Sequence, residues 1–586
     1  MKKKWCPYFI ARQSVLKCKI LVCSYNYLVD PKVAEVVSKE IESSSIVIFD
    51  EAHNIDSACI EAFSITLDQK IIISCRTALN SVVKQISNLK TQNNEKLKQE
   101  YELLLEGLKK LKNNQNKDFF LPNPIISQEI LEESVPGNIR KSDHFVSFLQ
   151  RFVEYLASRM NTRQLIVETP LAFLRNIQQK VGIDKRSLRF CSERLRSLLS
   201  VIELDNDSQI SSPLGLVSSF GTIVSTFEKG FCVIVEPFDP STPNLFHPKL
   251  YLSCMDASLA MKPIFERFKC IIITSGTLSP LDMYPRLLNF RPCVVASLTM
   301  SLARRSVFPM IVTRGSDQGI LSSSFSDRFE PSVIRNYGIL VSDICASVPD
   351  GVVCFFTSYR HMEAAINSWS EMELLSKIQK YKLVFAETPN VAETNLALDG
   401  YRRACECGRG GLLFSIARGK VSEGIDFYDH LGRAVIVLGV PYVYTLSTVL
   451  RTRLDYLRDN YSIKEADFLT FDAMRHSAQC VGRVMRSKSD YGIMILADHR
   501  FSRPSRIKKL PKWIQENLTS ANIGLSSDDA VQLAKKFLKE MAQPLTQESQ
   551  LGVSMLNEEQ LKSEKFLKRL EILQNASILE TVGPFD

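Results

Sequence analysis

Two adjacent carboxylates follow an apolar run and could do phosphate chemistry. Asp50, Glu51, Ala52 and His53 come directly after residues 45–49, which read SIVIF. Asp50 could hold Mg²⁺ through a water molecule, and Glu51 could orient and deprotonate a water that attacks a γ-phosphate. A solvated acidic turn after a strand is the alternative. The position at a strand end favours the nucleotide site.

A glycine-flanked loop is the second signal. Residues 418–427, RGKVSEGIDF, come directly after the apolar run 411–416. Glycines beside charged residues let a phosphate or a nucleic-acid backbone approach the main chain closely. Taken alone, the segment fits an ordinary connecting loop equally well.

A row of cationic side chains is the third signal. If residues 471–486 form a helix, Arg475, Gln479, Arg483 and Arg486 share one face of it. Guanidinium groups gather at such a face when an anion lies opposite, because each planar fork can bind two phosphate oxygens. A solvated basic face is the other interpretation. The three signals occur in one order on α/β sequence and reinforce each other, and the hydroxyl-rich turn at 274–278 is suited to link nucleotide and nucleic-acid sites.

Short apolar runs must position these residues. They end in polar or glycine residues and are typical of strands buried on both faces of parallel sheets, whose carboxyl ends hold active residues. We predict two α/β domains with strands at 45–49, 270–273, 352–356, 382–385, 411–416, 434–438 and 492–496. Between them, apolar residues spaced by three and four, as in 97–111 and 145–156, predict a mostly helical insertion.

Composition narrows the class of protein. The net charge of +9 is compatible with a polyanionic partner, and no apolar run approaches the roughly 20 residues that span a bilayer, so we expect no membrane contact. Fifteen cysteines without C-x-x-C pairs or a secretory signal predict mostly buried, reduced thiols in a nuclear or cytosolic protein.

The sequence resembles the XPD family, the superfamily 2 iron–sulfur DNA helicases of transcription factor TFIIH. The resemblance rests on the blocks at 5–9, 47–56, 253–260, 274–282, 417–427, 439–445, 468–476 and 479–492. It implies two RecA-like motor domains: residues 1–61 with the DEAH box and an iron–sulfur remnant, 62–254 as the helical arch insertion, 255–305 as the return of the first domain, 306–545 as the second, and 546–586 as a helical tail.

The resemblance also implies an activity. Such a protein would use ATP and Mg²⁺ to move 5′ to 3′ on single-stranded DNA and at DNA junctions. It would work in the nucleus, in nucleotide excision repair and in transcription initiation by RNA polymerase II. Its partners would be the TFIIH core subunits and the anchor of the kinase module.

The first domain's motif residues acquire roles by this resemblance. Asp50 and Glu51 correspond to the Walker B carboxylates, with Asp50 holding Mg²⁺ through water, and His53 couples them to the second motor domain.

Residues of the second domain acquire roles in the same way. Arg483 and Arg486 would be the fingers that reach the γ-phosphate of ATP, with Gln479 beside them. Gly424 and Asp426 would belong to the motif that senses both nucleotide and DNA.

The 586-residue sequence lacks the phosphate-binding loop of the family pattern. It contains no G-x-x-x-x-G-K-[ST], and Gly419-Lys420 lacks the preceding glycine and the following hydroxyl. We expect the loop to lie upstream of Met1, in a fragment or a shortened isoform, and the first sheet to expose apolar surface. The chain alone should then have no ATPase activity. The alternative function is that of a non-catalytic scaffold that binds TFIIH. A third interpretation places the chain with the related iron–sulfur helicases that act in cohesion or in crossover control.

The family's [4Fe–4S] cluster is a further point of departure. Cys6 resembles the last of four ligands, and we expect the other three before residue 1. Cys18 and Cys23 lie in an apolar strand pattern and are expected to be buried thiols, so a cluster on this chain is doubtful. For DNA contact, Tyr442 and Tyr444 are candidate stacking aromatics, with local packing as the alternative. The basic run 503–512 is expected to be a solvated surface.

Overall fold

The chain contains two compact units. The computed structural model describes residues 6–15, 17–31, 33–34, 41–92, 142–201, 208–239, 242–299, 305–419, 421, 425–485 and 490–544, with 563, 564, 567 and 568 near the end. The first unit is Met1–Cys293 with Tyr444–Phe468, and the second is Val294–Val443 with Leu469–Asp586. Within the described ranges, none of the helices has the length and apolar character needed to cross a bilayer.

A parallel pair of strands forms the α/β layer of the first unit. β1 (Ile46–Phe49) pairs with β6 (Cys270–Ile273), and Phe49 lies opposite Ile273. Val47 and Phe49 are buried, whereas Ile46 and Ile48 are 64% and 59% exposed, so one face of this pair presents apolar surface. The helices of this layer are α1 (Pro7–Val15), α2 (Asn26–Val29), α4 (Ile55–Phe63), α13 (Ser258–Arg267) and α14 (Met283–Leu287).

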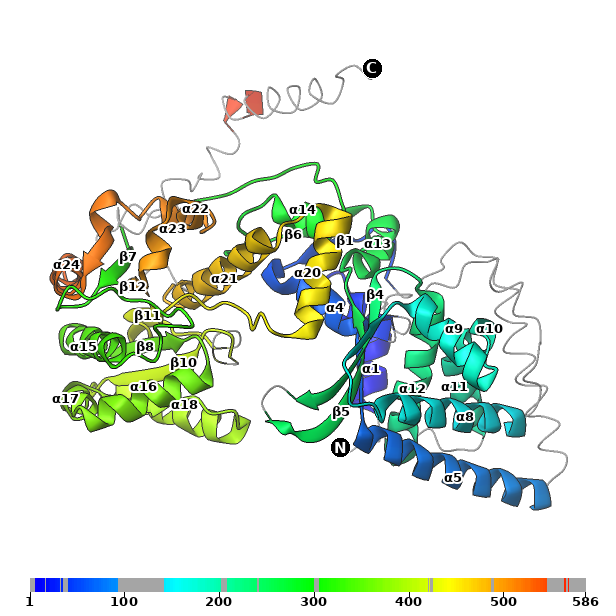
Figure 1. Cartoon of the computed structure of the whole chain (residues 1–586). Helices are drawn as coiled ribbons and strands as arrows, with labels where there is room; N and C mark the ends of the chain where they lie inside the picture. Colours follow the sequence, from blue (N-terminus) through cyan, green and yellow to red (C-terminus); the bar gives the residue numbers. More distant parts are fainter. Residues whose placement is uncertain are drawn as a thin grey trace. The chain divides into compact units, whose positions relative to one another are not determined.

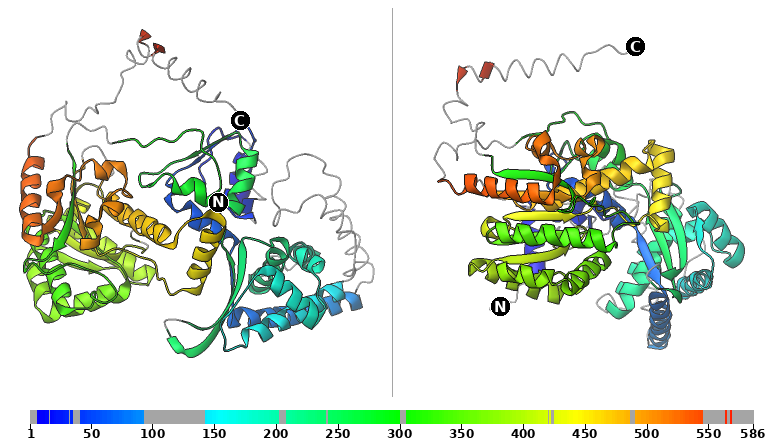
Figure 2. Two further views of the ribbon diagram at one scale, coloured as in Figure 1. Left: turned by 45° about the horizontal axis from the view of Figure 1, so that its top comes forward. Right: turned by 60° about the vertical axis from the view of Figure 1, so that its left-hand side comes forward.

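The insertion contains a sheet as well as helices. Its four antiparallel strands have the order β2-β5-β4-β3. Their bounds are Ile65–Asp68 (β2), Ile166–Glu168 (β3), Phe231–Asp239 (β4) and Thr242–Cys254 (β5). The helices that accompany the sheet (Figure 2) are α5 (Gln69–Gln92), α8 (Ser142–Met160), α9 (Pro170–Val181), α10 (Lys185–Arg189), α11 (Cys191–Val201) and α12 (Ser208–Thr226).

The prediction of a helical insertion is therefore confirmed in its helices but missed most of this sheet. β2 and β3 are short, and polar and proline residues interrupt the apolar pattern of β5. The predicted apolar face at 145–156 is confirmed in α8, where Phe145, Phe148 and Phe152 form a stacked row that continues to Phe220. The predicted helix at 97–111 lies outside the described residues.

A seven-stranded parallel sheet forms the second unit (Figure 1), in the order β13-β7-β12-β11-β8-β10-β9. The strands are β7 (Val307–Arg314), β8 (Gly351–Phe356), β9 (Leu383–Ala386), β10 (Gly411–Ile416), β11 (Ala434–Leu438), β12 (Gly492–Ala497) and β13 (Ile523–Ser526). β8, β10, β11 and β12 are buried at every position, so the prediction of strands buried on both faces is confirmed for them. The same prediction is wrong for β1, β6 and β9, which have exposed or only half-buried positions, because β1 and β6 form a two-stranded sheet and β9 is the edge strand of its sheet. β7 and β13 were not predicted.

Helices cover both faces of this sheet and divide its core. Val352, Cys354 and Phe356 of β8 face one cluster with α15 (Pro331–Ser347), α16 (Tyr359–Glu371), α17 (Leu374–Tyr381) and α24 (Ser527–Met541). Val353 and Phe355 face the other cluster with α18 (Val391–Glu406), α21 (Glu465–Gly482) and the short α23 (Lys512–Gln515). The alternation follows from the two-residue period of a strand. The predicted tail helix lies almost wholly outside the described residues.

Candidate functional site

The DEAH residues lie at the carboxyl end of β1, beside the hydroxyl-rich turn that follows β6. Ala52 donates its backbone N–H to Thr274 O at 3.0 Å, and Thr274 donates to Phe49 O at 2.9 Å. Parallel pairing in register brings both strand ends to one edge, which explains why segments more than 200 residues apart in the sequence meet here.

Glu51, His53 and Ser275 form a hydrogen-bonded triangle at this edge. Ser275 Oγ donates to Glu51 Oε2 at 2.8 Å and lies 3.1 Å from His53 Nδ1, which is itself 3.2 Å from Glu51 Oε2. The Glu51 side chain is 56% exposed, whereas His53 is buried. The arrangement leaves a carboxylate open to solvent while its neighbours fix its direction, as a general base requires.

The backbone at the carboxylates is strained. Glu51 has φ 50°, in the left-handed region that side-chain-bearing residues seldom adopt. Its N–H is held by Asp50 Oδ1 at 3.0 Å, and the 3₁₀ turn η2 (Ala52–Asn54) follows directly. Such strain persists only where the surroundings hold it, and it often marks functional sites.

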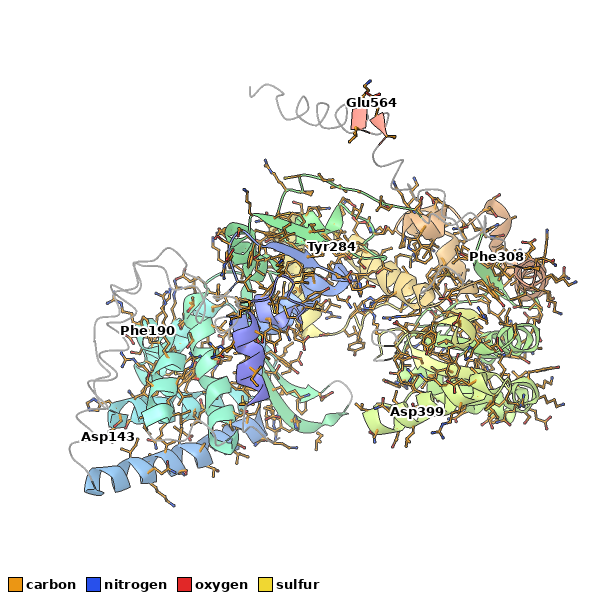
Figure 3. All side chains as sticks on the ribbon, turned by 180° about the vertical axis from the view of Figure 1, so that it is seen from behind. Asp143, Phe190, Tyr284, Phe308, Asp399 and Glu564 are labelled. Carbon is orange, nitrogen blue, oxygen red and sulfur yellow. The ribbon has the colours of Figure 1, made fainter. Side chains whose placement is uncertain are left out.

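Two tyrosines hold the backbone around the box. Tyr284, labelled in Figure 3, is buried and donates its hydroxyl to His53 O at 3.1 Å. Tyr25 donates to Asp50 O and packs edge-on against Phe49. Burial raises the pKa of Tyr25 to about 12, and Asp50 and Glu51 add to the shift, so this hydroxyl remains a donor.

In the second unit, helix α21 ends at Gly482, so the predicted helix over 471–486 is wrong at its end. Arg483 lies in a following turn whose N–H groups bond three residues back, so it does not continue the helical face of Arg475 and Gln479. Glycine is the weakest non-proline helix former, which gives the reason for the stop. Arg483 Nη1 donates to Asp426 Oδ1 at 3.2 Å, so the structure brings these two predicted residues together.

Arg475 belongs to a buried charge cluster rather than to an open basic face. Asp472 receives Nη2 of Arg475 at 2.7 Å and Nη2 of Arg418, and Arg418 also donates to Pro441 O at 2.8 Å. Burial alone raises the pKa of Asp472, but the charges of Arg418 and Arg475 outweigh it and hold the pKa far below its usual range. Desolvation, with the charge of Arg418, lowers the pKa of the adjacent His476 to about 4, so His476 is neutral at pH 7.

Several predicted site residues have no described placement or stay untested. Gly424 and Arg486 lie outside the described residues. Gln479 is buried on α21. Asp50 lies exposed at the end of β1. The roles assigned to these residues therefore stay predictions.

The thiols near the chain start do not form a metal site. Cys6, Cys18 and Cys23 are exposed and free, so the prediction that Cys18 and Cys23 are buried is wrong. The reason is local: residues 17–24 adopt irregular backbone, not a strand. In the part of the chain that the structure describes, no three His, Cys, Asp or Glu side chains are grouped to hold a metal. These residues do not fit a [4Fe–4S] cluster, which needs four thiolates.

The candidate DNA-contact aromatics differ from each other. Tyr442 packs locally, since its hydroxyl accepts from Arg506 Nη2 at 2.8 Å and its ring lies beneath the Arg500 and Arg506 guanidiniums. Tyr444 is 55% exposed and stays available for stacking. The basic run 503–512 is mixed, with Arg503 and Lys508 exposed and Arg506 half-buried.

Sequence reasoning missed the side chains that support the box. Tyr25, Ser275 and Tyr284 were not singled out as site residues, and neither was Asp472. Ser275 lies in the hydroxyl-rich turn that was recognised, and its place after an apolar run was the available signal. Tyr25 and Tyr284 carry no local pattern that distinguishes them from packing aromatics.

Sequence comparison gives three family matches along the chain. Residues 1–72 match DEAD_2, residues 85–230 match the helical and beta-bridge domain, and residues 341–517 match the helicase C-terminal domain. A solved XPD helicase structure covers 90% of this chain and 76% of its own, with a TM-score of 0.50 and 17% identity, a likeness of fold alone.

Curated relatives share much more sequence. The general transcription and DNA repair factor IIH helicase subunit XPD of Schizosaccharomyces pombe is 49% identical over 97% of this chain and 74% of its own length. The Arabidopsis thaliana subunit is 49% identical over 95% of this chain and 74% of its own. The mouse regulator of telomere elongation helicase 1 is 26% identical, over 94% of this chain and 47% of its own.

A DEAH box on a parallel strand pair, followed by a helicase C-terminal domain, defines a helicase. More particularly, the chain belongs to the family of XPD helicase subunits of general transcription and DNA repair factor IIH. The higher identity to these subunits favours them over the telomere helicases as the group to which the chain belongs.

Proposed function

We propose that the protein is the ATP-dependent helicase subunit of TFIIH, moving 5′ to 3′ on single-stranded DNA. It acts in the nucleus, in nucleotide excision repair and in transcription initiation by RNA polymerase II. The observation that carries the proposal is the Glu51–His53–Ser275 triangle, found in a chain of the XPD family. The mildly basic charge of +9 agrees with a nucleic-acid partner.

The described residues suggest a division of labour in ATP hydrolysis. Asp50 would hold Mg²⁺ through water, and Glu51 would take the proton of the attacking water. His53 and Ser275 hold the Glu51 carboxylate in one direction. Arg483, positioned by Asp426, stabilises charge on the transferred phosphoryl group, with Gln479 and Arg486 beside it. Gly424 and Asp426 belong to the sequence motif that senses both nucleotide and DNA.

Glu51→Gln, made in the native protein purified with its partners, tests this proposal. We expect DNA-stimulated ATP hydrolysis to fall by at least about 100-fold, because the amide cannot take a proton. Glu61→Gln, at an exposed position of α4, is the matched control and should retain full activity. Duplexes with either a 5′ or a 3′ overhang test polarity, and preferential unwinding from the 3′ overhang would refute the direction.

A second candidate function is a scaffold on TFIIH without catalysis. The 586-residue sequence contains no G-x-x-x-x-G-K-[ST], the loop that cradles the phosphates of ATP. The purified 586-residue chain should bind TFIIH core subunits and the kinase-module anchor but hydrolyse no ATP above background. Hydrolysis by this chain that is stimulated by DNA and abolished by Glu51→Gln would exclude the scaffold as its sole role.

A further inference from the structure

One segment of the chain crosses between the two units. Residues Tyr444–Phe468 belong to the first unit, although β11 before them and most of α21 after them belong to the second. The segment contains α20 (Thr448–Tyr461), which lies near α4 and α13 in Figure 1. Ser447 caps its start by accepting from Leu450 N, and Ser462 in the left-handed conformation ends it.

A buried ion pair fixes α20 to the helix that follows the DEAH box. Asp56, in the first turn of α4, is 0% exposed and accepts from Arg453 Nη2 at 3.0 Å. Asp56 lies three residues after His53 in the sequence. A carboxylate this deeply buried needs its charge partner. Removing Arg453, or the charge of Asp56, therefore strongly weakens the attachment of α20 to α4.

A second buried carboxylate holds the other end of α20. Asp256 receives the Tyr456 hydroxyl at 3.0 Å and the Tyr461 hydroxyl at 2.8 Å, while Ser258 N donates to it at 2.9 Å. Burial and the Asp256 carboxylate together raise the pKa of Tyr461 to about 12, so the hydroxyl stays a donor at neutral pH. Two separate charged contacts set both the position of α20 along its axis and its rotation about it.

Arg453 of the Asp56–Arg453 pair also contacts α21, the helix that precedes Arg483, the proposed arginine finger. The Arg453 guanidinium lies 5.0 Å from the ring centre of Phe468, which is in the first turns of α21. α21 starts at Glu465 and continues without a break to Gly482, through Asp472, Arg475 and Gln479. The DEAH-box helix, Arg453 and the start of α21 therefore form one continuous series of contacts.

From this series we propose that Asp56, Arg453 and Asp256 are positioning residues that couple ATP hydrolysis to DNA unwinding. Because these contacts hold the start of α21 rigidly, that helix follows changes at the DEAH box. Apolar packing alone would bury the helix as well but would permit it to slide, whereas directed charge contacts fix its register. The inference rests on the proposed helicase function.

Two folded variants of the native protein, in complex with its partners, test the coupling. Asp56→Asn removes the buried charge, and Tyr461→Phe removes one hydroxyl while keeping the ring. The measured quantity is the number of base pairs unwound per ATP hydrolysed. We expect this ratio to fall by about fivefold or more in both variants, with the KM for ATP changed by less than about twofold. Asp455→Asn, in an exposed ion pair with Arg458 on the same helix, should leave the ratio unchanged.

Two substitutions at Arg453 separate a positioning role from general destabilisation of the fold. Arg453→Lys keeps the charge and should retain most of the ratio, whereas Arg453→Met should lose it, with both variants assayed well below the lower of their two thermal midpoints. An unchanged ratio in the folded Asp56→Asn and Tyr461→Phe variants would overturn the inference; if Asp56→Asn does not fold, Tyr461→Phe decides alone.

A second measurement keeps this inference separate from the proposed function. In the Tyr461→Phe variant of the 586-residue chain, backbone hydrogen exchange should become faster across Tyr444–Phe468. Unchanged exchange in this segment would overturn the inference that Tyr461 helps to attach α20. A lack of DNA-stimulated ATPase activity in the wild-type native protein would instead overturn the proposed function.

Discussion

Asp472 is a buried carboxylate of the second unit that is shared by two arginines. Its two carboxylate oxygens accept from Arg418 and Arg475, and His476 Nδ1 lies 2.9 Å from its backbone oxygen. Arg418 leads the glycine-flanked loop, so Asp472 connects that loop to α21. A polar cluster of this kind stabilises the fold only while every member keeps its partners.

Asp472→Asn is expected to destabilise the second unit by about 3 kcal/mol at pH 7, because two buried guanidiniums lose their counter-charge. The pKa of Asp472 is lowered by folding, so its contribution is present above the unfolded pKa and is lost as pH falls. The difference between parent and variant should therefore shrink below about pH 4. Denaturant unfolding at several pH values measures it, with the exposed Asp399→Asn (Figure 3) as control; a pH-independent difference would contradict the assignment.

Helix α24 closes one face of the seven-stranded sheet. Phe537 stacks on Phe308 of β7 with ring centres 5.1 Å apart. The helix begins with a capping box, in which Ser526 Oγ accepts from Asp529 N and Asp529 Oδ2 accepts from Ser526 N, both at 3.3 Å. The box satisfies N–H groups that would otherwise have no acceptor at the end of β13.

Ser526→Ala is expected to lower the free energy of unfolding of the second unit by about 1 kcal/mol, the usual effect of losing an N-cap. Denaturant unfolding followed by circular dichroism measures it. Ser505→Ala, at an exposed position of α22 (Pro504–Ile507), should have no effect. No loss in Ser526→Ala would show that the cap is dispensable, and equal losses in both variants would show that the loss does not come from the cap.

For the chain as a whole, compact units and sequence order do not coincide. The segment Tyr444–Phe468 lies late in the sequence but is part of the first unit. Its stability should therefore follow that of the DEAH-bearing unit and not that of its sequence neighbours.

Calorimetry of the 586-residue chain tests this assignment. Tyr461→Phe should lower the transition of the first unit by roughly 3 °C, since a hydrogen bond to a buried carboxylate is lost. The transition of the second unit should not move. Asp472→Asn is the reciprocal variant and should shift only the second transition. Equal shifts of both transitions by either variant would mean that the units unfold together.

The sequence by itself determined the strands that are buried on both faces and the polar residues at their ends. β10 and β11 have the predicted bounds, and the DEAH box follows β1 as expected. These features are local, because an apolar run and the residue after it are adjacent in the chain. The prediction of phosphate chemistry at Asp50 and Glu51 rests on the same local pattern.

Only the tertiary structure decided what depends on distant partners. Ser275 meets Glu51 because two strands pair in register, and Asp56 and Arg453 meet across almost 400 residues of sequence. The burial of Arg475 against Asp472 and the exposure of Cys18 and Cys23 likewise contradicted patterns that looked clear locally. Periodicity reports which face of an element is apolar, but the partner that covers that face, or leaves it open, is set by the packing of the whole unit.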